Sequence, residues 1–341
     1  MFIVEGVFMR RRLGRTGVGM MRLAAVSLAL VLFGGPPIAE AQRAPEVRRI
    51  GYLGTGGQHT GFYETIREGL RDLGHVEGRN LIIEYRSGDN RPRLDELAAE
   101  LVRLKVEVMV VPGAATSAAK RATDTIPIVF AYSGDPIAAG FVKSLGRPGG
   151  NMTGITWLAF ELVGKRLEIL KEAAPRVSRV AVLANPAHPG EQRELAETEQ
   201  AARAVGATVQ YHQVRTTADV HAAFDAIVRH SANAVLVFPD AVTMAHRRQV
   251  AEFAAKHRLP SVFGWREYIE AGGLMAYGPN RRETARRLAV YVDRVLKGAK
   301  PADLPVEQPT KFELVINLKT AKVLGIEISQ SLLLRADQVI E

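Results

Sequence analysis

The sequence has no cysteine among its 341 residues, and this absence excludes several kinds of chemistry. The chain can form no disulfide, has no thiolate nucleophile, and offers no cysteine to which a lipid could be attached. Packing alone must therefore hold the fold together.

The signature motifs of many α/β enzymes are missing as well. The segment GTGGQHTG at residues 54–61 lacks the third glycine of a G-x-G-x-x-G loop, so a flexible loop and a phosphate-binding loop both stay open as interpretations. Neither a G-x-x-x-x-G-K-[ST] loop, nor a G-x-S-x-G elbow, nor an H-E-x-x-H pair occurs. The eight histidines lie mostly in polar contexts that are typical of the surface. The sequence thus predicts no catalytic residue, no metal site and no cofactor.

The N-terminal segment has the pattern of a secretory signal peptide. Five arginines between residues 10 and 22 precede the apolar run 23–33, and the segment closes with Ala39-Glu40-Ala41. The run is shorter than the about 20 apolar residues that span a bilayer, which disfavours an uncleaved anchor. Cleavage after Ala41 removes five arginines and two glutamates, so the formal net charge falls from +9 to +6 over the remaining 300 residues. The basic residues are scattered along predicted helices, and no nucleic-acid surface is expected.

Short apolar runs alternate with helical segments along the rest of the chain. One series of strand candidates begins near residues 50, 81, 106 and 126, and a second begins near residues 180, 208, 234 and 261. Successive starts are 20 to 31 residues apart, which is the length that a strand, a helix and two short loops occupy. The sequence therefore predicts two sets of βαβ units around parallel sheets.

The helices between these strands each show one apolar stripe. The stripes are Phe62-Ile66-Leu70-Leu73 and Leu94-Leu97-Leu101-Leu104 in the first set, and Val163-Leu167-Leu170-Ala174 and Val220-Phe224-Ile227-Val228 in the second. One-sided stripes of this kind pack a helix onto a sheet and leave its charged face to solvent. We interpret them as core.

The segment GRPGGNMTGIT at residues 146–156 separates the two series. Glycine and proline dominate it, which indicates the end of a first lobe and a hinge crossing. The segments VEVMVVPGAATSAAKRA and NAVLVFPDAVTMAHRRQ each give a strand, a proline, a small loop and a helix, so the two halves are built alike. The predicted fold class is α/β, with two doubly wound lobes of parallel sheet joined by a hinge.

Ligands of doubly wound sheets bind beyond the carboxyl ends of the strands, and the residues at these ends are the candidate binding residues. The first half contributes Gly54, Thr55, Ala115, Thr116, Ser117, Ser133 and Asp135. The second half contributes Asn185, Asp240, Trp265, Glu267 and Tyr277, and we expect Tyr277 to end the last strand.

The helix start at residues 113–117 carries only small side chains. Unpaired N–H groups at such a start attract an anion, and Thr116 and Ser117 add hydroxyl donors. The alternative is that Thr116 only caps its own helix. Similarly, Asp135 and Asp240 either hold an ammonium group or cap the following helix. Trp265 and Tyr277 either stack on a flat ligand or belong to the core. An anion niche with acids and aromatics but no nucleophile favours a receptor pocket over a catalytic one.

Five longer segments carry a resemblance to a known family. They are FYETIREGLRDLGHVEGRNLIIEYR, IPIVFAYSGDPIAAGFVKSLGRPGGNMTGIT, GKRLEILKEAAP, EAGGLMAYGPN and LPVEQPTKFELVINLKTAKVLGIEISQSLLLRADQVIE. Together they resemble the ABC transporter substrate-binding protein family related to the tryptophan-binding lipoprotein TrpX. The likeness covers nearly all of the chain after the signal peptide. It departs from the lipid-anchored relatives because no lipobox cysteine is present.

The resemblance implies a periplasmic-binding-protein type I fold whose two lobes close on a small molecule. In that fold the chain crosses the hinge three times, and we place the crossings near Ile155, near 277–279 and near Val306. Lobe I then comprises residues 42–156 and about 279–305, and lobe II residues 157–278 and about 306–341. The resemblance also implies that the loop 115–117 holds a carboxylate, and that the loop after the fourth strand and Asp240 face the cleft.

The predicted function is that of a periplasmic receptor and not of an enzyme. It captures a small carboxylate-bearing solute, with an amino acid as the leading candidate, and delivers it as a monomer to the membrane subunits of an ABC permease. Three alternatives are an enzyme on a similar scaffold, a transcriptional regulator and a sensor input domain. The first needs a nucleophile, a metal cluster or a phosphate loop. The second needs a helix-turn-helix before residue 50, and the third a following transmembrane segment.

Overall fold

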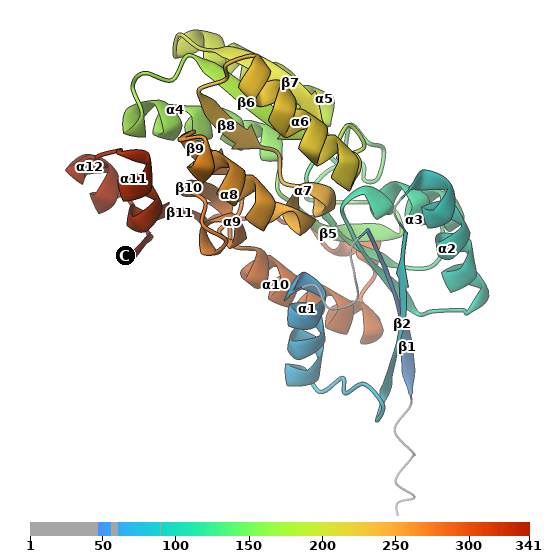
Figure 1. The fold of residues 1–341 in the computed structure, drawn as a ribbon. Coiled ribbons are helices and arrows are strands. Elements are labelled where there is room, and N and C mark those ends of the chain that lie inside the picture. The colour runs from blue at the N-terminus through green and yellow to red at the C-terminus, as the bar shows by residue number, and fades with distance from the viewer. Residues whose placement is uncertain (1–46, 56–60, 89) are drawn as a thin grey trace, which may run out of the picture. The chain divides into compact units, whose positions relative to one another are not determined.

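The computed structural model of the chain describes residues 47–55, 61–88 and 90–341, and residues 47–341 form one compact unit. The predicted signal peptide at residues 1–41 lies outside the described residues. Two β-sheets organise this unit, each with helices on both faces (Figure 1). This arrangement confirms the α/β fold class that the spacing of apolar runs predicts.

The first sheet has five strands in the order β2-β1-β3-β4-β5, all parallel. The strands are β1 (Arg48–Gly54), β2 (Leu81–Ser87), β3 (Val108–Pro112), β4 (Ile128–Tyr132) and β5 (Met152–Thr156). Every residue of β4 and β5 is buried, as expected for parallel strands that are covered on both faces. The segment 146–156, predicted to be the end of the first lobe and a hinge crossing, ends in a strand, β5.

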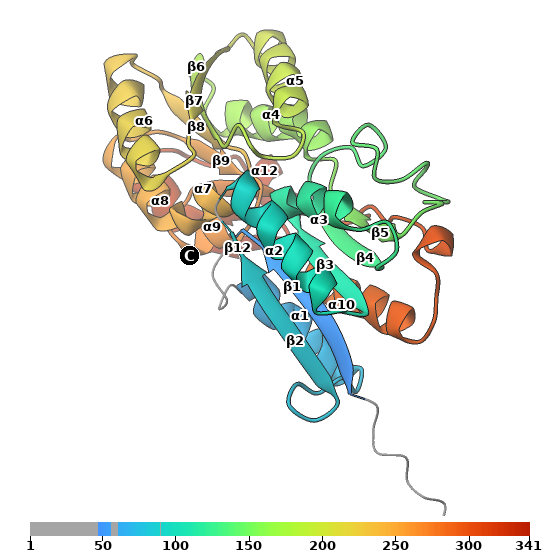
Figure 2. The same ribbon diagram turned by 90° about the vertical axis from the view of Figure 1, so that its right-hand side faces the viewer.

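Four helices cover this sheet, and together they form the first lobe. They are α1 (Gly61–Asp72), α2 (Arg91–Arg103), α3 (Thr116–Ala122), which follows the 3₁₀ turn η1 (Gly113–Ala115), and α10 (Arg281–Leu296). Helices α1 and α10 pack together on one face, and α2 and α3 on the other (Figure 2). Phe62, Ile66 and Leu70 are buried as predicted, whereas Leu73 lies beyond the end of α1 and is 37% exposed, so its place in the stripe is wrong.

The second sheet has seven strands in the order β12-β11-β10-β9-β8-β6-β7. They are β6 (Arg179–Ala184), β7 (Thr208–Gln213), β8 (Ala234–Val237), β9 (Ser261–Phe263), β10 (Met275–Pro279), β11 (Phe312–Asn317) and β12 (Gln338–Ile340). Strand β11 runs antiparallel to β10, and all other pairs are parallel. Tyr277 lies in β10, so the expectation that its strand is the last one is wrong.

The remaining helices cover this sheet and complete the second lobe. They are η2 (Ala159–Leu162), α4 (Val163–Ala173), α5 (Glu191–Ala204), α6 (Thr217–Arg229), α7 (Ala241–Ala245), α8 (Arg247–Lys256), α9 (Glu267–Glu270), α11 (Leu318–Leu324) and α12 (Gln330–Leu334). Alternate residues of β6 face opposite cores: Val180 and Val182 pack toward α4 and α5, Ala181 and Leu183 toward α6 and α8. Val228 is 50% exposed, so its place in the apolar stripe of α6 is wrong.

The chain passes between the two sheets three times. It leaves the first sheet after β5, returns after β10 to form α10, and crosses again after the 3₁₀ turn η3 (Pro301–Asp303) to enter β11. At the last crossing the Glu307 N–H donates to Gly154 O at 2.9 Å, and Glu307 O accepts from the Thr156 N–H at 2.9 Å. Residues 306–307 thus run beside β5. The lobe boundaries that the sequence suggests stay a prediction.

The lobes also touch where the loop after β4 meets the loop before α5. A Cβ atom built on Gly190 would lie 2.8 Å from Gly134 Cα, and one built on Gly134 would lie 3.1 Å from Gly190 N. Gly190 has a φ of +81°, which further restricts the position to glycine. Nearby, the Arg193 guanidinium of α5 lies 3.4 Å from Asp135 Oδ2. The backbones of Gly134 and Gly190 are thus in direct contact, with no side chain between them.

Candidate ligand-binding site

A cavity of about 660 Å³ lies between the two lobes, at the carboxyl ends of the strands. The first lobe contributes Tyr52, Thr55, Phe62 and Ser133 together with the segment 112–114, and the second lobe contributes His188, Asp240, Trp265 and Glu267. Trp157 and Arg281 line it from the crossings between the sheets. The cavity is in the size range of sites for small organic molecules. It lies where doubly wound sheets bind their ligands.

The start of α3 brings backbone to the cavity wall. Strand β3 ends at Pro112, and Gly113, with a φ of +65°, begins the turn η1. No atom of the described residues lies within 4 Å of a Cβ atom built on Gly113, so the backbone conformation and not crowding favours glycine there. Gly113 and Ala114 line the cavity, whereas Ala115, Thr116 and Ser117 do not.

Three aromatic rings form the base of the cavity. Trp157 packs edge-on against Phe62 at 6.3 Å between ring centroids and against Trp265 at 5.7 Å. The indole N–H of Trp157 donates to Thr284 Oγ1 at 3.3 Å, which fixes the ring on helix α10. Each of the three rings is less than a tenth exposed, so the base is a rigid apolar surface that a flat ligand can contact.

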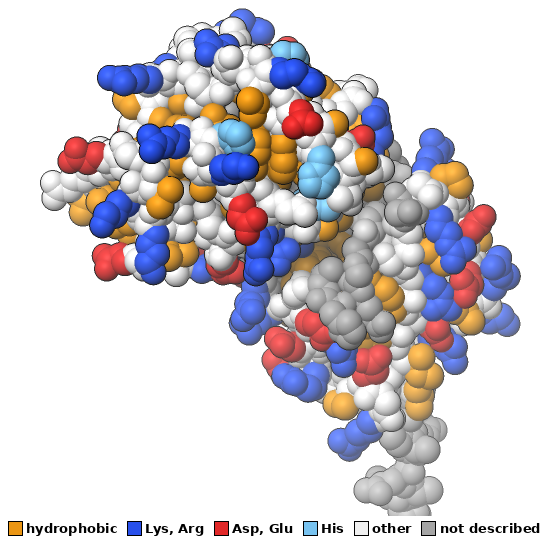
Figure 3. All heavy atoms as spheres, in the orientation of Figure 1, with side chains coloured by type: hydrophobic (Ala, Val, Ile, Leu, Met, Phe, Trp, Pro, Cys, Tyr) orange, Lys and Arg blue, Asp and Glu red, His pale blue; other side chains and the backbone are white. Residues whose placement is uncertain are grey.

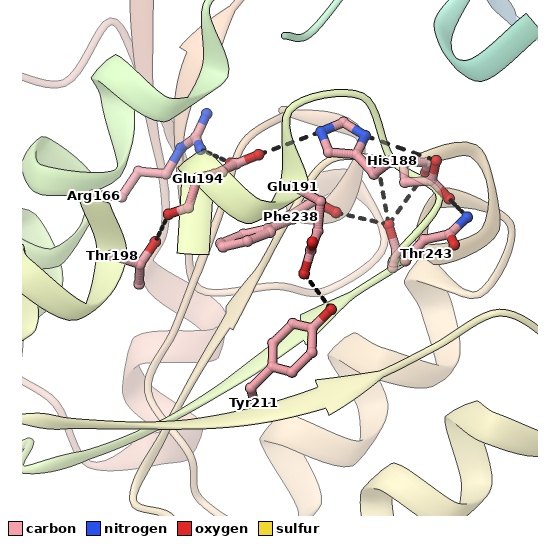
Figure 4. Close-up of polar contacts among 10 residues, drawn as sticks. Arg166, His188, Glu191, Glu194, Thr198, Tyr211, Phe238 and Thr243 are labelled. Carbon is pink, nitrogen blue, oxygen red and sulfur yellow. Dashed lines mark hydrogen bonds and ion pairs between the residues drawn. The ribbon is translucent and has the colours of Figure 1, made fainter. Parts of the chain in front are cut away.

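A chain of buried charges stands behind the second-lobe wall (Figure 4). Arg166 Nη1 lies 3.4 Å from Glu194 Oε1, His188 Nε2 lies 3.3 Å from Glu194 Oε2, and His188 Nδ1 lies 3.8 Å from Asp240 Oδ2. Arg166 Nε also donates to Tyr277 O at 2.9 Å. Two cations face two carboxylates, so the group is neutral as a whole. Of the four side chains, only His188 and Asp240 line the cavity.

The pKa of His188 follows from these neighbours. Burial alone would lower it, but the nearby carboxylates of Asp240 and Glu194 raise the pKa to about 9. His188 is therefore a cation at neutral pH, and the prediction that the histidines lie on the surface is wrong for this residue, which is 5% exposed. His188 lies in the loop between β6 and α5, and it is buried because Glu194 and Asp240 lie against it in three dimensions.

Asp240 holds the helix that follows it, and it also reaches the cavity. Its Oδ1 accepts from the Val242 N–H at 2.8 Å and from Asn185 Nδ2 at 3.0 Å, and it forms a capping box with Thr243. Burial alone would raise the pKa of Asp240, but the His188 ring, the Asn185 amide and the Val242 N–H together lower it. The carboxylate is thus charged at neutral pH.

The predicted binding residues fall into two groups. Those that line the cavity are Thr55, Ser133, Asp240, Trp265 and Glu267; those outside its lining are Gly54, Ala115, Thr116, Ser117, Asp135, Asn185 and Tyr277.

Three of the residues outside the lining, Thr116, Asp135 and Asn185, form side-chain hydrogen bonds within the protein. The fully buried Thr116 hydroxyl donates to Gly113 O at 2.8 Å and to Val111 O at 3.2 Å. Ala115, without a side-chain hydrogen bond, is the N-cap of α3, so the alternative that Thr116 caps its helix is wrong. Asp135 Oδ1 accepts from the N–H groups of the next turn, including Ile137 at 2.9 Å. Asn185 Oδ1 accepts from the Ala187 N–H at 3.0 Å.

Several lining residues, among them Phe62, Trp157, His188 and Arg281, are not predicted from the sequence as candidate ligand contacts. Phe62 belongs to the core stripe of its helix, as the sequence predicts, but it lies at the end of the stripe that reaches the cavity. Trp157 follows the unrecognised strand β5, His188 lies in a polar loop, and Arg281 lies among the arginines of α10. The only usable signal was Trp157, one of two tryptophans in the chain, placed directly after the predicted crossing.

The described residues contain no group of three or more His, Asp or Glu side chains arranged to hold a metal ion. Within the same residues, the helices are too short or too polar to cross a membrane. On the face shown in Figure 3, Lys and Arg side chains are dispersed among acidic and apolar ones and form no single basic surface.

Comparison with known proteins places this geometry in a family. Residues 58–340 match the family described as ABC transporter substrate binding protein. The tyrosine-binding protein of Clostridioides difficile (strain R20291) is 25% identical over 260 residues, which cover 76% of this chain and 74% of that protein.

Two solved structures are similar over 86% of this chain and 100% of their own, each with a TM-score of 0.78. One is a conserved domain protein from Vibrio cholerae O1 biovar El Tor, at 27% identity. The other is an ABC domain in complex with L-Trp from Streptococcus pneumonia, at 26% identity. The family match covers most of the sequence, and the two-lobed fold agrees with it. The chain therefore belongs to the ABC transporter substrate-binding protein family.

Proposed function

We propose that this protein captures an amino acid with an aromatic side chain between its two lobes and releases it unchanged to an ABC permease. The observation that carries the proposal is the cavity itself: its base consists of Phe62, Trp157 and Trp265, and its walls carry charges of both signs. A zwitterion with a flat apolar side chain complements such a surface. The similar proteins whose names specify tyrosine and L-Trp support the same ligand class.

In this proposal five of the predicted residues contact the ligand: Thr55, Ser133, Asp240, Trp265 and Glu267. Thr55 and Ser133 offer hydroxyl groups from the first lobe, and the two carboxylates face them from the second. The ammonium group of the ligand binds beside the carboxylates. The other predicted residues support the wall from behind, through the hydrogen bonds of Thr116, Asp135 and Asn185.

Ligand binding shifts the protein from an open to a closed arrangement of its lobes. Contacts to residues on both lobes favour the closed state, and a ligand shifts the equilibrium only by its differential affinity for the two states. The lobes are residues 42–156 with about 279–305, and residues 157–278 with about 306–341. After removal of residues 1–41, the monomer acts in the periplasm without a lipid anchor, and its closed form docks on the permease.

A ligand screen tests the proposal. The purified protein is heated with each of the common L-amino acids and with sugars and dicarboxylates as comparison classes. A ligand at a hundred times its Kd stabilises the native state by about 2.7 kcal/mol, which raises the melting temperature by several degrees. We expect the largest rise with tryptophan, tyrosine or phenylalanine, and recovery of unchanged ligand by mass spectrometry. A rise with only sugars or dicarboxylates, or turnover of the ligand, would contradict the proposal.

A further inference from the structure

Arg281 lines the cavity and contacts side chains of both lobes. It is the first residue of α10, directly after the chain returns from the second sheet to the first lobe. Its guanidinium lies over the Trp265 ring at 4.2 Å from the centroid and 5.1 Å from the centroid of Phe62. Nη1 donates to Glu267 Oε1 at 3.0 Å. The side chain thus contacts an aromatic ring of each lobe.

The three nitrogens of this guanidinium differ in access. Nη1 is engaged by Glu267, and Nε is buried without a partner among the described residues. Nη2 makes no hydrogen bond within the described chain and is not among its buried atoms, although the side chain as a whole is only 18% exposed. Since Arg281 lines the cavity, Nη2 is the guanidinium nitrogen left for a ligand.

The other cations of the lining are less suited to bind an anion. Arg247 and Arg248 are exposed, and Arg247 Nη1 already donates to Met244 O at 3.0 Å. Solvent screens charges at such positions. His188 faces two carboxylates of its own lobe. Arg281 is held in place by stacking and by Glu267, so little side-chain entropy is lost when it forms a further hydrogen bond.

We propose that Arg281 binds the carboxylate of the ligand through Nη2, and that Glu267 positions the guanidinium. The inference rests on the proposed function and adds the anchoring residue to it. The sequence predicts the anion site at the loop 115–117, but the Thr116 hydroxyl donates to backbone carbonyls there. The proposal places the anion site at the start of α10 instead. The N-terminal end of this 16-residue helix adds a favourable field for an anion. The carboxylate then sits at a chain crossing between the lobes.

Calorimetric titration with L-tryptophan and L-tryptophanamide tests this assignment, because the amide keeps the indole and the α-amino group but has no carboxylate. We expect Arg281→Gln to weaken L-tryptophan binding by about ten- to a hundredfold, the range of a hydrogen bond to a charged group. Binding of L-tryptophanamide should be weak in the wild type and unchanged in Arg281→Gln. Arg281→Lys, which keeps the charge but not the planar fork, should fall between the two. Glu267→Gln should weaken both ligands, because both carry the amino group, but should weaken L-tryptophan by the larger factor, because the guanidinium also loses its positioning partner.

Arg282→Gln is the matched control, because Arg282 is exposed on the same turn of α10 and does not line the cavity. Circular dichroism checks that each variant is folded. If Arg281→Gln keeps the wild-type affinity for L-tryptophan, or weakens both ligands equally, the assignment is overturned while the proposed function stands. If the wild type binds no aromatic amino acid, the proposed function fails and this assignment fails with it.

Discussion

The buried ring of His188 makes a quantitative prediction about stability and pH. Its pKa is about 9 in the folded protein and about 6.5 in an unfolded chain, because Asp240 and Glu194 favour the charged ring. A raised pKa contributes stability that is fully present below pH 6.5 and is lost as the pH rises through 9. At 1.36 kcal/mol per pKa unit, the contribution at low pH is about 3 kcal/mol. The substitution His188→Gln, which places a neutral side chain there, removes this contribution to stability.

Urea unfolding between pH 6 and pH 10 measures this term. We expect the free energy of unfolding of His188→Gln to be lower than that of the wild type at pH 6, and the difference to shrink by about 3 kcal/mol by pH 10. His221→Gln is the control, because His221 is exposed and has no ion pair among the described residues. A difference between wild type and His188→Gln that is constant across this range would refute the reasoning, since only the titration of the buried ring makes it vary.

Three further predictions concern packing and ligand contact. Gly154→Ala should lower the free energy of unfolding by about 4 kcal/mol or more in urea titrations, because its Cβ would lie 2.0 Å from Phe130 O. Gly61→Ala is the control and should change it by less than about 0.5 kcal/mol, because among the described residues no atom lies within 4 Å of a Cβ built there. Thr116→Val should cost about 1–3 kcal/mol of stability but leave the calorimetric Kd for L-tryptophan unchanged, since its buried hydroxyl bonds only backbone carbonyls. Trp265→Leu keeps an apolar side chain but loses the flat face under Arg281, and should raise the Kd for L-tryptophan about tenfold; an unchanged Kd would remove Trp265 from the site.

The fold was readable from the sequence because apolar periodicity is a local property. The strands predicted from spacing are present as β1 to β4 and β6 to β9. Strand β5 is not predicted from the sequence because Gly154 interrupts its apolar pattern. Gly154 has a φ of +147° and lies too close to Phe130 for any side chain, so a residue that weakens the strand signal is the one that the packing requires.

The site was only partly readable, because its chemistry arises from contacts between distant segments. Trp265 and Asp240 follow strands, and the rule for strand ends finds them. His188 and Arg281 resemble surface residues in their local sequences. The environment of His188 depends on Asp240, which follows β8, and that of Arg281 depends on Trp265, which follows β9. The periodicity of apolar residues does not predict such tertiary contacts.

The close approach of Gly134 and Gly190 has a practical consequence. Since two bare backbones touch there, the volume of an inserted side chain sets how far the two halves stand apart at that point. A series of alanine, valine and leucine at residue 134 would act as spacers of increasing width. Such a series would yield a set of receptors with graded interlobe angles, each of which could be crystallised or measured by small-angle scattering without any ligand.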